Sequence, residues 1–406
     1  MHILSGNGRC GTSDGNSGHG KNAATFNHPY GICTLPDRNG TLVVSDSQSN
    51  TLRFIQPSLS SNDLISIYSK PFVWTVPNAC LLDPRGLCVV EDGKGIMICD
   101  AGHHKIKFLA FSKTAFSTDM DRYQAGTVST FAGMGKKGYK DTLLSASLFN
   151  TPSACTLFTD GSLLVCDTGN HAIRRIAYNE SNQVVVHTIA GGANLPVQTL
   201  DDQYGYMDPK VHSAVHKTDT NSMKRSGYTD GRGRQARFRS PMGMACNKKG
   251  EIIIADVFNH ALRLITNRDM ERSSLFHDEW VVSTIAGGKR SGHRDGACSV
   301  ALFNQPTSVC FASDGSLLVA ERGNSCLRQV GGISSVISKT TTYSWVRTIT
   351  IDTPATSRLF PEGVEPPMNA PRGVCALSNT HAWYNGLNNC NNIVVGVADT
   401  GNVSNT

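Results

Sequence analysis

Histidine stands near a carboxylate at three places in this sequence, a pairing that suits metal binding or general-base catalysis. His104, His171 and His260 each follow an aspartate by four residues. The aspartates are Asp100, Asp167 and Asp256. A catalytic or metal-binding group is needed once, whereas this pair recurs along the chain. We therefore expect the histidines to pack in turns and strands, with each aspartate accepting hydrogen bonds within its own repeat.

Two further patterns suggest chemistry and lack what that chemistry needs. The glycine-rich stretch 132–138 is superficially a phosphate loop, but no Gly-Lys-Ser/Thr ending and no helical pattern follow it. The 13 cysteines include no Cys-x-x-Cys pair and no zinc-type spacing. No nucleotide site, no metal and no cofactor are predicted.

Many of the cysteines take the place of small residues in a repeat. Cys33, Cys88, Cys310 and Cys375 each lie four residues after a repeated proline, where another copy has Ala245. Free cysteine behaves as a small buried hydrophobe. We therefore predict that these four are buried thiols with no disulfide and no metal.

The elements that position these residues repeat six times. The third copy reads FNTP at 149–152, DG at 160–161, LLVCD at 163–167 and NHAIR at 170–174. Short runs rich in Leu, Ile and Val between Gly, Asn and Asp clusters are typical of strands, and Asp-Gly between two runs indicates a hairpin. Four strands in each of six copies is the pattern of a β-propeller. The copies begin at Pro29, Pro84, Pro152, Pro241, Pro306 and Pro371.

These motifs resemble the NHL repeat family, and the resemblance covers nearly the whole chain. It implies an all-β fold, a six-bladed propeller of four-stranded blades, as a single domain over 1–406. The stretch HILSG at 2–6 is similar to the strand TIAGG at 188–192, so we expect the N-terminal strand to close the ring. The second copy lacks the Phe-Asn element, and the sixth ends near 402–406, where we expect an incomplete blade. Residues given a structural role in the repeat are Asp46, Asp100, Asp167, Asp256, Asn170, His171, Arg174, Asn259, His260, Arg263 and Arg328.

One connection is longer than the repeat requires. The prolines at 152 and 241 are 89 residues apart, against 65 or 68 for neighbouring copies, and the excess lies at about 193–226. From Lys217 to Arg239 there are seven basic and two acidic residues, a local net charge of +5. Loops on one face of a scaffold often carry function. The alternative is a solvated insertion. The predicted partner-binding residues are Lys224, Arg225, Arg232, Arg234, Lys136, Lys137, Tyr204 and Tyr206.

Three functions remain open. The first is a non-catalytic scaffold that binds a protein partner, preferably an acidic one, through this loop face. The second is RNA binding through the same basic face, which would depend on salt. The third, suggested by related propellers, is a metal-dependent lyase or hydrolase at the central channel, although no ligand set or catalytic residue can be assembled.

Composition excludes other classes. Charged residues make up 17% of the chain and the net charge is +6, which is unlike a coiled coil or a disordered chain. No apolar run approaches the roughly 18 residues of a membrane helix, and the N-terminus does not read as a signal peptide. Free cysteines and the lack of a signal favour a cytoplasmic location.

Overall fold

The chain folds into short antiparallel β-strands. The structure, a computed structural model, describes residues 2–5, 10–16, 23–36, 41–56, 72–77, 79–90, 93–111, 125–192, 226–267, 280–288, 290–312, 314–332, 344–349, 371–378, 381–387 and 391–396. These residues form six sheets joined by turns and short 3-10 helices. The fold is an all-β propeller fold, as the repeats predict.

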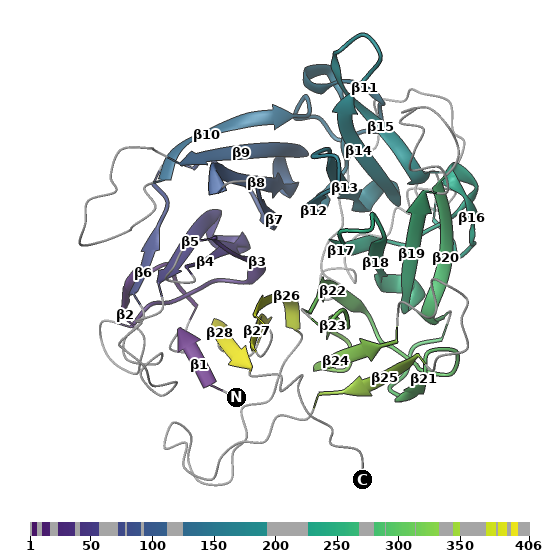
Figure 1. Ribbon diagram of the computed structural model, residues 1–406. Coiled ribbons are helices and arrows are strands. Elements are labelled where there is room, and N and C mark those ends of the chain that lie inside the picture. Colours follow the sequence, from purple (N-terminus) through teal and green to yellow (C-terminus); the bar gives the residue numbers. More distant parts are fainter. Residues whose placement is uncertain are drawn as a thin grey trace, which may run out of the picture. The chain divides into compact units, whose positions relative to one another are not determined.

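The chain divides into two compact units, and residues 78–284 form the second (Figure 1). This second unit holds three sheets, of which the last contains a strand that ends just past the unit's boundary. In the order of hydrogen-bonded neighbours they are β10 (Ala125–Ala132), β9 (Lys105–Phe111), β8 (Gly95–Asp100) and β7 (Pro84–Val89); β11 (Thr142–Leu143), β15 (Val184–Gly191), β14 (Ala172–Tyr178), β13 (Leu163–Asp167) and β12 (Pro152–Leu157); and β16 (Gly231–Arg232), β20 (Trp280–Gly287), β19 (Ala261–Asn267), β18 (Ile252–Asp256) and β17 (Pro241–Cys246).

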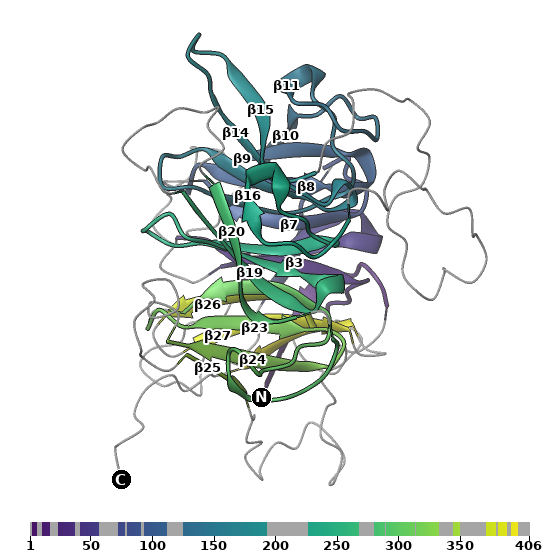
Figure 2. The ribbon, with the colours of Figure 1, turned by 90° about the vertical axis from the view of Figure 1, so that its right-hand side faces the viewer.

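The first unit, residues 1–77 and 285–406, holds the other three sheets. Within each sheet the strands run side by side (Figures 1 and 2). The sheets are β2 (Gly15–Asn16), β6 (Phe72–Thr75), β5 (Thr51–Gln56), β4 (Leu42–Asp46) and β3 (Pro29–Thr34); β21 (Gly296–Ala297), β25 (Trp345–Thr348), β24 (Cys326–Gly331), β23 (Leu317–Glu321) and β22 (Pro306–Phe311); and β1 (His2–Ser5), β28 (Asn391–Gly396), β27 (His381–Leu387) and β26 (Pro371–Ser378).

The prediction of four strands per blade is incomplete. Five sheets each use one continuous stretch of chain, and four of these contain an additional strand of two residues. In one of them Thr142 pairs with Val186 and Leu143 with Val185. Two residues are too few to show an alternating pattern, so the sequence gives no signal for such a strand.

The remaining sheet joins both ends of the chain. His2 pairs with Val395 and Ile3 with Val394, which confirms that the N-terminal strand shares a blade with the C-terminal strands. The expectation of an incomplete last blade is wrong for this sheet, because β27 lies between β26 and β28 and completes four strands. The run at 391–396 is therefore the third strand of its blade.

Turn residues set the ends of the strands. The Asp-Gly hairpin between β12 and β13 places Gly161 at φ +80°, a conformation that glycine adopts without strain. A one-turn 3-10 helix follows the second strand of several sheets: η1 (Ser47–Ser49), η4 (Ala101–His103), η6 (Thr168–Asn170) and η8 (Val257–Asn259). Each of these turns ends in a left-handed residue, which reverses the chain into the third strand.

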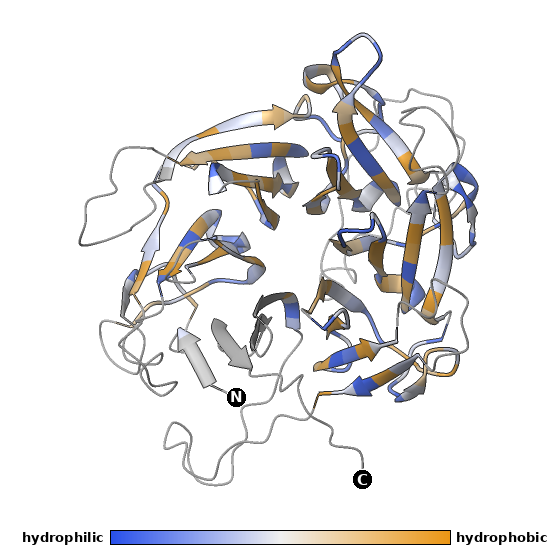
Figure 3. Ribbon diagram, in the orientation of Figure 1, coloured by the Kyte–Doolittle hydropathy of each residue, from blue (hydrophilic) through white to orange (hydrophobic). Residues whose placement is uncertain are grey.

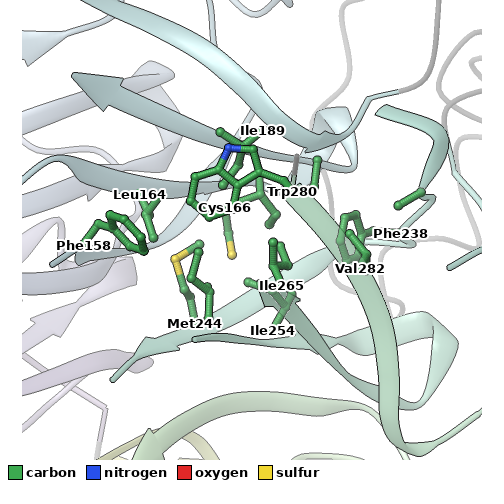
Figure 4. Close-up of a cluster of buried hydrophobic side chains, with 14 residues drawn as sticks. Phe158, Leu164, Cys166, Ile189, Phe238, Met244, Ile254, Ile265, Trp280 and Val282 are labelled. Atoms are coloured by element: carbon green, nitrogen blue, oxygen red, sulfur yellow. The ribbon is translucent and has the colours of Figure 1, made fainter. Parts of the chain in front are cut away.

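Apolar side chains fill the space between neighbouring sheets of the second unit. Bands of hydrophobic residues along its strands alternate with hydrophilic ones (Figure 3). In the cluster of Figure 4, Phe158, Leu164 and Cys166 come from one sheet, and Ile254 and Trp280 from the next. Complete burial of each such side chain contributes about 1.5–3 kcal/mol. This packing holds the loops at the strand ends in fixed positions.

Candidate functional site

The repeated aspartate is fully engaged inside its blade. One oxygen of Asp167 accepts the backbone N–H of Asn150 at 2.7 Å. The other accepts the amide of Asn170 and the guanidinium of Arg174, each at 2.7 Å. The side chains of Asp167 and Arg174 are completely buried. A carboxylate bonded in this way holds the turn together and has no oxygen left for a substrate.

The same arrangement recurs in the other blades. Asp256 accepts from Arg239 N–H, Asn259 and Arg263. Burial raises the pKa of Asp256 to about 6, against the opposing effect of Arg263. The carboxyl is therefore still ionised at neutral pH and pairs with the arginine. The corresponding pairs elsewhere are Asp46 with Arg53, Asp100 with Lys107, and Glu321 with Arg328.

A second set of aspartates, which the sequence analysis missed, lies on the loops between blades. Asp141 binds Arg174 at 2.6 Å and accepts the backbone N–H and the hydroxyl of Thr188, each at 3.1 Å. Its counterparts bind the arginine and the outer-strand threonine of their own sheets. The available signal was an aspartate before glycine in three of the four loops. The counterparts are Asp14, Asp230 and Asp295.

Each of these arginines also lies over aromatic rings. The guanidinium carbon of Arg174 is 5.1 Å from the ring centre of Phe149 and 4.9 Å from that of Tyr139. Such contacts stabilise a desolvated cation. This explains the phenylalanine of the Phe-Asn-x-Pro motif. The other pairs are Arg53 with Phe26, Arg263 with Phe238 and with Tyr228, and Arg328 with Phe303.

The repeated histidines connect neighbouring blades. His104 and His171 occupy the left-handed position at the end of the 3-10 turn. Their Nδ1 atoms accept the backbone N–H of Thr151 and Ser240, at 3.1 and 3.0 Å. In each pair the accepting histidine belongs to one sheet and the donating residue to the next sheet along the chain. An accepting nitrogen carries no proton, so this geometry requires the neutral ring in both.

The 3-10 turns and the inter-blade loops lie on the same side of their sheets. Asn170 donates its amide to the carbonyl of Gly138 at 2.8 Å, and Asn259 donates to Gly227 at 2.7 Å. In two of the sheets, these bonds connect the 3-10 turn with the inter-blade loop of the same sheet. We call the turns 101–104, 168–171 and 257–260, with loops 79–83, 133–151 and 226–240, the loop face of the second unit.

Only some of the predicted partner-binding residues are exposed on the described loop face. Lys136 and Arg232 are exposed on the loop face, and Lys137 is half-buried beside them. Arg234 is not free, because it forms an ion pair with Asp141 that links two blades. The sequence could not reveal this pair, since its members are far apart in the chain. Lys224, Arg225, Tyr204, Tyr206 and nearly all of the insertion lie outside the described residues.

Positive charge on the loop face exceeds the acidic charge available to pair with it. Among the described residues, each aspartate there is already engaged, Asp83 by Arg85 and the others as above. Lys136, Arg232 and Arg239 take part in none of the ion pairs of the described residues. Two more lysines share this property, Lys105 and Lys140. An uncompensated positive surface of this kind attracts anionic partners.

The cysteines of the described residues are all free thiols. Cys33, Cys88 and Cys310 are half-buried, so the prediction of fully buried thiols is wrong for these three. They lie on strands at the edge of their sheets, which are less covered than the central strands. The side chain of Cys375 lies outside the described residues.

Metal binding and membrane insertion are two further possibilities for the described residues. No group of three or more His, Cys, Asp and Glu side chains there is arranged to hold a metal ion. No helix in the described part of the chain has the length and hydropathy needed to cross a membrane.

Comparison with known proteins gives partial matches. The NHL repeat model matches residues 303–330. The chain is 24% identical over 319 residues to Protein SUPPRESSOR OF QUENCHING 1, chloroplastic, of Arabidopsis thaliana, covering 76% of this chain and 25% of that protein. It is 28% identical over 249 residues to NHL repeat-containing protein 2 of Gallus gallus, covering 60% of this chain and 26% of that protein. The matched region thus spans about a quarter of each relative.

Structural similarity supports the fold. A crystal structure of a protein from Bacteroides thetaiotaomicron aligns with 98% of this chain and 79% of its own, with a TM-score of 0.56 and 13% identity. At that identity the likeness concerns the fold alone. The repeat motifs, the sheets that they form and the matches to NHL repeat sequences agree, and together they support the NHL repeat family for this chain.

Proposed function

We propose that this chain is a non-catalytic interaction scaffold that binds a protein partner through the loop face of the second unit. One observation carries the proposal. The repeated Asp and Arg side chains bond to each other and the repeated histidines accept backbone N–H groups, whereas several lysines and arginines on the same face form no ion pair with the described acidic residues. The first group stabilises the blades, and the second is left for a partner with negative charge.

We further propose that the six sheets form one six-bladed ring, as a single domain over 1–406. The support is the sheet that joins β1 to β28, because it connects the two ends of the chain. Apolar faces of propeller blades are buried against neighbouring blades, so a closed ring leaves no blade face uncovered.

RNA is the alternative ligand for a basic face. Single-stranded RNA is usually bound by exposed aromatic rings on which bases stack. On the described loop face, Tyr139 and Tyr228 lie under the guanidinium groups of Arg174 and Arg263. These rings are therefore occupied, and a protein partner is the better match.

The test is affinity capture from native lysate with and without nuclease, comparing parent protein with two charge-reversal variants. Arg232→Glu with Arg239→Glu changes the loop face. Lys248→Glu with Lys249→Glu is the control, because both lysines are exposed in the β17–β18 hairpin, at the other end of the same sheet. We expect specific partners to be lost only with the first variant. Equal capture by both variants, or capture that nuclease abolishes, would contradict the proposal.

A further inference from the structure

We propose that the loop face carries a docking patch for an acidic protein segment that also presents an apolar side chain. The patch consists of Leu82, Met134, Lys105 and Lys136. The inference rests on the proposed function and deepens it by naming the place and the chemistry of the partner.

Three chain segments meet at this patch. The N–H of Gly102 donates to the carbonyl of Leu82 at 2.9 Å, and a Cβ added at Gly102 would lie 2.5 Å from Cγ of Leu82. A Cβ added at Gly135 would lie 2.7 Å from Cε of Lys105 and 3.8 Å from the carbonyl oxygen of His103. The turn 101–104 therefore touches Leu82 on one side and the 134–136 loop on the other.

Two large apolar side chains are exposed there. Leu82 is 42% exposed and Met134 is 55% exposed. Single exposed apolar residues are normal on a protein surface. These two differ because Leu82 and the glycines on either side of Met134 lie beside the same short turn, 101–104, next to lysines.

Leu82 differs in side chain from the residues at the same position of the other repeats, and the hydrogen bonds made here do not require its side chain. It stands two residues before the repeated proline, where the other copies have polar residues. The backbone at this position does the structural work, because Leu82 N–H donates to Asp100 at 2.7 Å and its carbonyl accepts from Gly102. The side chain has no part in either bond. The residues in the other described copies are Asn27, Asn150, Arg239 and Asn304.

Met134 and Lys105 depart from the repeat in the same place. Met134 follows the glycine of the closing strand, where other copies have Gly192 and Gly288. Lys105 follows the left-handed turn residue, where the other described copies have the uncharged residues Thr51, Ala172, Ala261 and Cys326. Departures at three positions that meet in space are unlike random drift along a repeat, and they join apolar surface to positive charge.

The lysines of the patch form no ion pair with a described acidic residue. Lys105 and Lys136 form none of the ion pairs in the described part of the chain. The nearest aspartates are engaged, Asp100 by Lys107 and Asp83 by Arg85. Exposed apolar side chains close to unpaired lysines match a partner segment that carries an apolar anchor and carboxylates. Leu and Met offer no aromatic face for base stacking, so a protein segment is favoured over RNA.

The experiment measures fluorescence anisotropy of short labelled probes. The main probe is a peptide of alternating Glu and Leu. The comparison probes are a Glu-Ser peptide, a Lys-Leu peptide and an oligouridine RNA. We expect the Glu-Leu peptide to bind best and its affinity to fall with added salt. Equal binding of the Glu-Ser peptide would remove the apolar part of the proposal, and preferential binding of RNA would overturn it.

Leu82→Asn, Met134→Gly and Lys105→Ala restore residues that other copies already carry, and Lys136→Ser changes an exposed side chain, so the fold should tolerate all four. Leu82→Asn with Met134→Gly should weaken Glu-Leu binding by about tenfold. Lys105→Ala with Lys136→Ser should weaken it similarly and reduce its dependence on salt. Lys248→Ser with Lys249→Ser is the control on the other hairpin and should bind like the parent. Circular dichroism checks folding, and Met134→Ser replaces Met134→Gly if the glycine loosens the loop.

Two results separate this inference from the proposed function. If the patch variants bind the Glu-Leu peptide as the parent does, the docking patch is refuted. If native partners are nevertheless lost with the Arg232 and Arg239 reversal, the scaffold function stands without this patch.

Discussion

At the scale of single residues, the groups that suggest catalysis hold the fold together. Asn170 and Arg174 both donate to Asp167, and His171 accepts a backbone N–H from the next blade. The recurrence of these residues along the sequence already indicated local roles. Which atom bonds to which could not be predicted, because His171 reaches a residue 69 positions away.

The environment of His104 keeps its ring neutral. Burial lowers the pKa of His104 from 6.5, the charges of Lys137, His103 and Arg85 lower it further, and Asp100 opposes them. A lowered folded-state pKa means that the unfolded chain takes up a proton first as pH falls. The stability from the neutral ring is therefore complete above about pH 6.5, and it is lost as pH falls through the folded-state pKa.

His104→Asn tests this dependence. Asn50 occupies the same left-handed position in the first blade at φ +58°, so asparagine fits the backbone. Below pH 6.5 we expect the variant to lose less stability on acidification than the parent, because one titrating acceptor is gone. Urea unfolding at several pH values measures this. An identical pH profile for parent and variant would show that the ring has no such role.

Asp167→Asn tests the buried ion pair. Asparagine removes the fully buried carboxylate and leaves Arg174 with the partly exposed Asp141, so we expect a loss of about 3 kcal/mol in the free energy of unfolding. Asp141→Asn is the comparison, since its carboxylate is partly exposed and Arg174 keeps Asp167. That variant should lose about 1 to 2 kcal/mol. Chemical denaturation measures both, and equal losses would contradict this ranking.

At the scale of elements, the sequence predicts the strands that carry clear motifs. The repeated proline, the Asp-Gly hairpin and the acidic strand end are local signals, and the N-terminal strand was found by its similarity to other closing strands. The strand β27 was missed, because its sequence HAWYNGL carries none of these motifs. The Arg234–Asp141 pair was missed because it depends on two loops meeting in space.

Deleting residues 2–5 tests the closing strand. Loss of β1 leaves β28 as an unpaired edge, which favours aggregation. We expect a loss of about 2 to 4 kcal/mol from the missing backbone hydrogen bonds, each worth about 1 kcal/mol. Denaturant unfolding and hydrogen exchange at 391–396 measure the effect, and a peptide of residues 1–8 added in trans should restore protection. Unchanged exchange would show that β1 contributes nothing to this sheet.

At the scale of the whole molecule, the blades repeat one motif and are therefore alike in structure. Residues that differ from the motif in a single blade are the candidates for function. The long insertion at 193–226 is the departure most visible in the sequence. The docking patch is visible only when the repeats are compared in space. A sequence alone shows that Leu82, Met134 and Lys105 are unusual, but it does not show that the segments carrying them meet at one turn.

The proposed single ring makes a prediction about unfolding. If all blades stabilise one another, both units should unfold in one transition, and the reactivity of the cysteines can report this without any substitution.

Buried thiols react slowly with alkylating reagents in the folded protein. The reagent is excluded from them, and burial raises the thiol pKa, that of Cys246 to about 11. Pulsed alkylation across a denaturant series, read by mass spectrometry, gives a midpoint for each thiol. We expect Cys99, Cys155 and Cys166 of the second unit to share their midpoint with Cys298 and Cys326 of the first. Exposed Cys10 and Cys80 should react at every concentration and serve as internal controls. Two separate midpoints, one for each unit, would show that the units fold independently and would rule out a single cooperative ring.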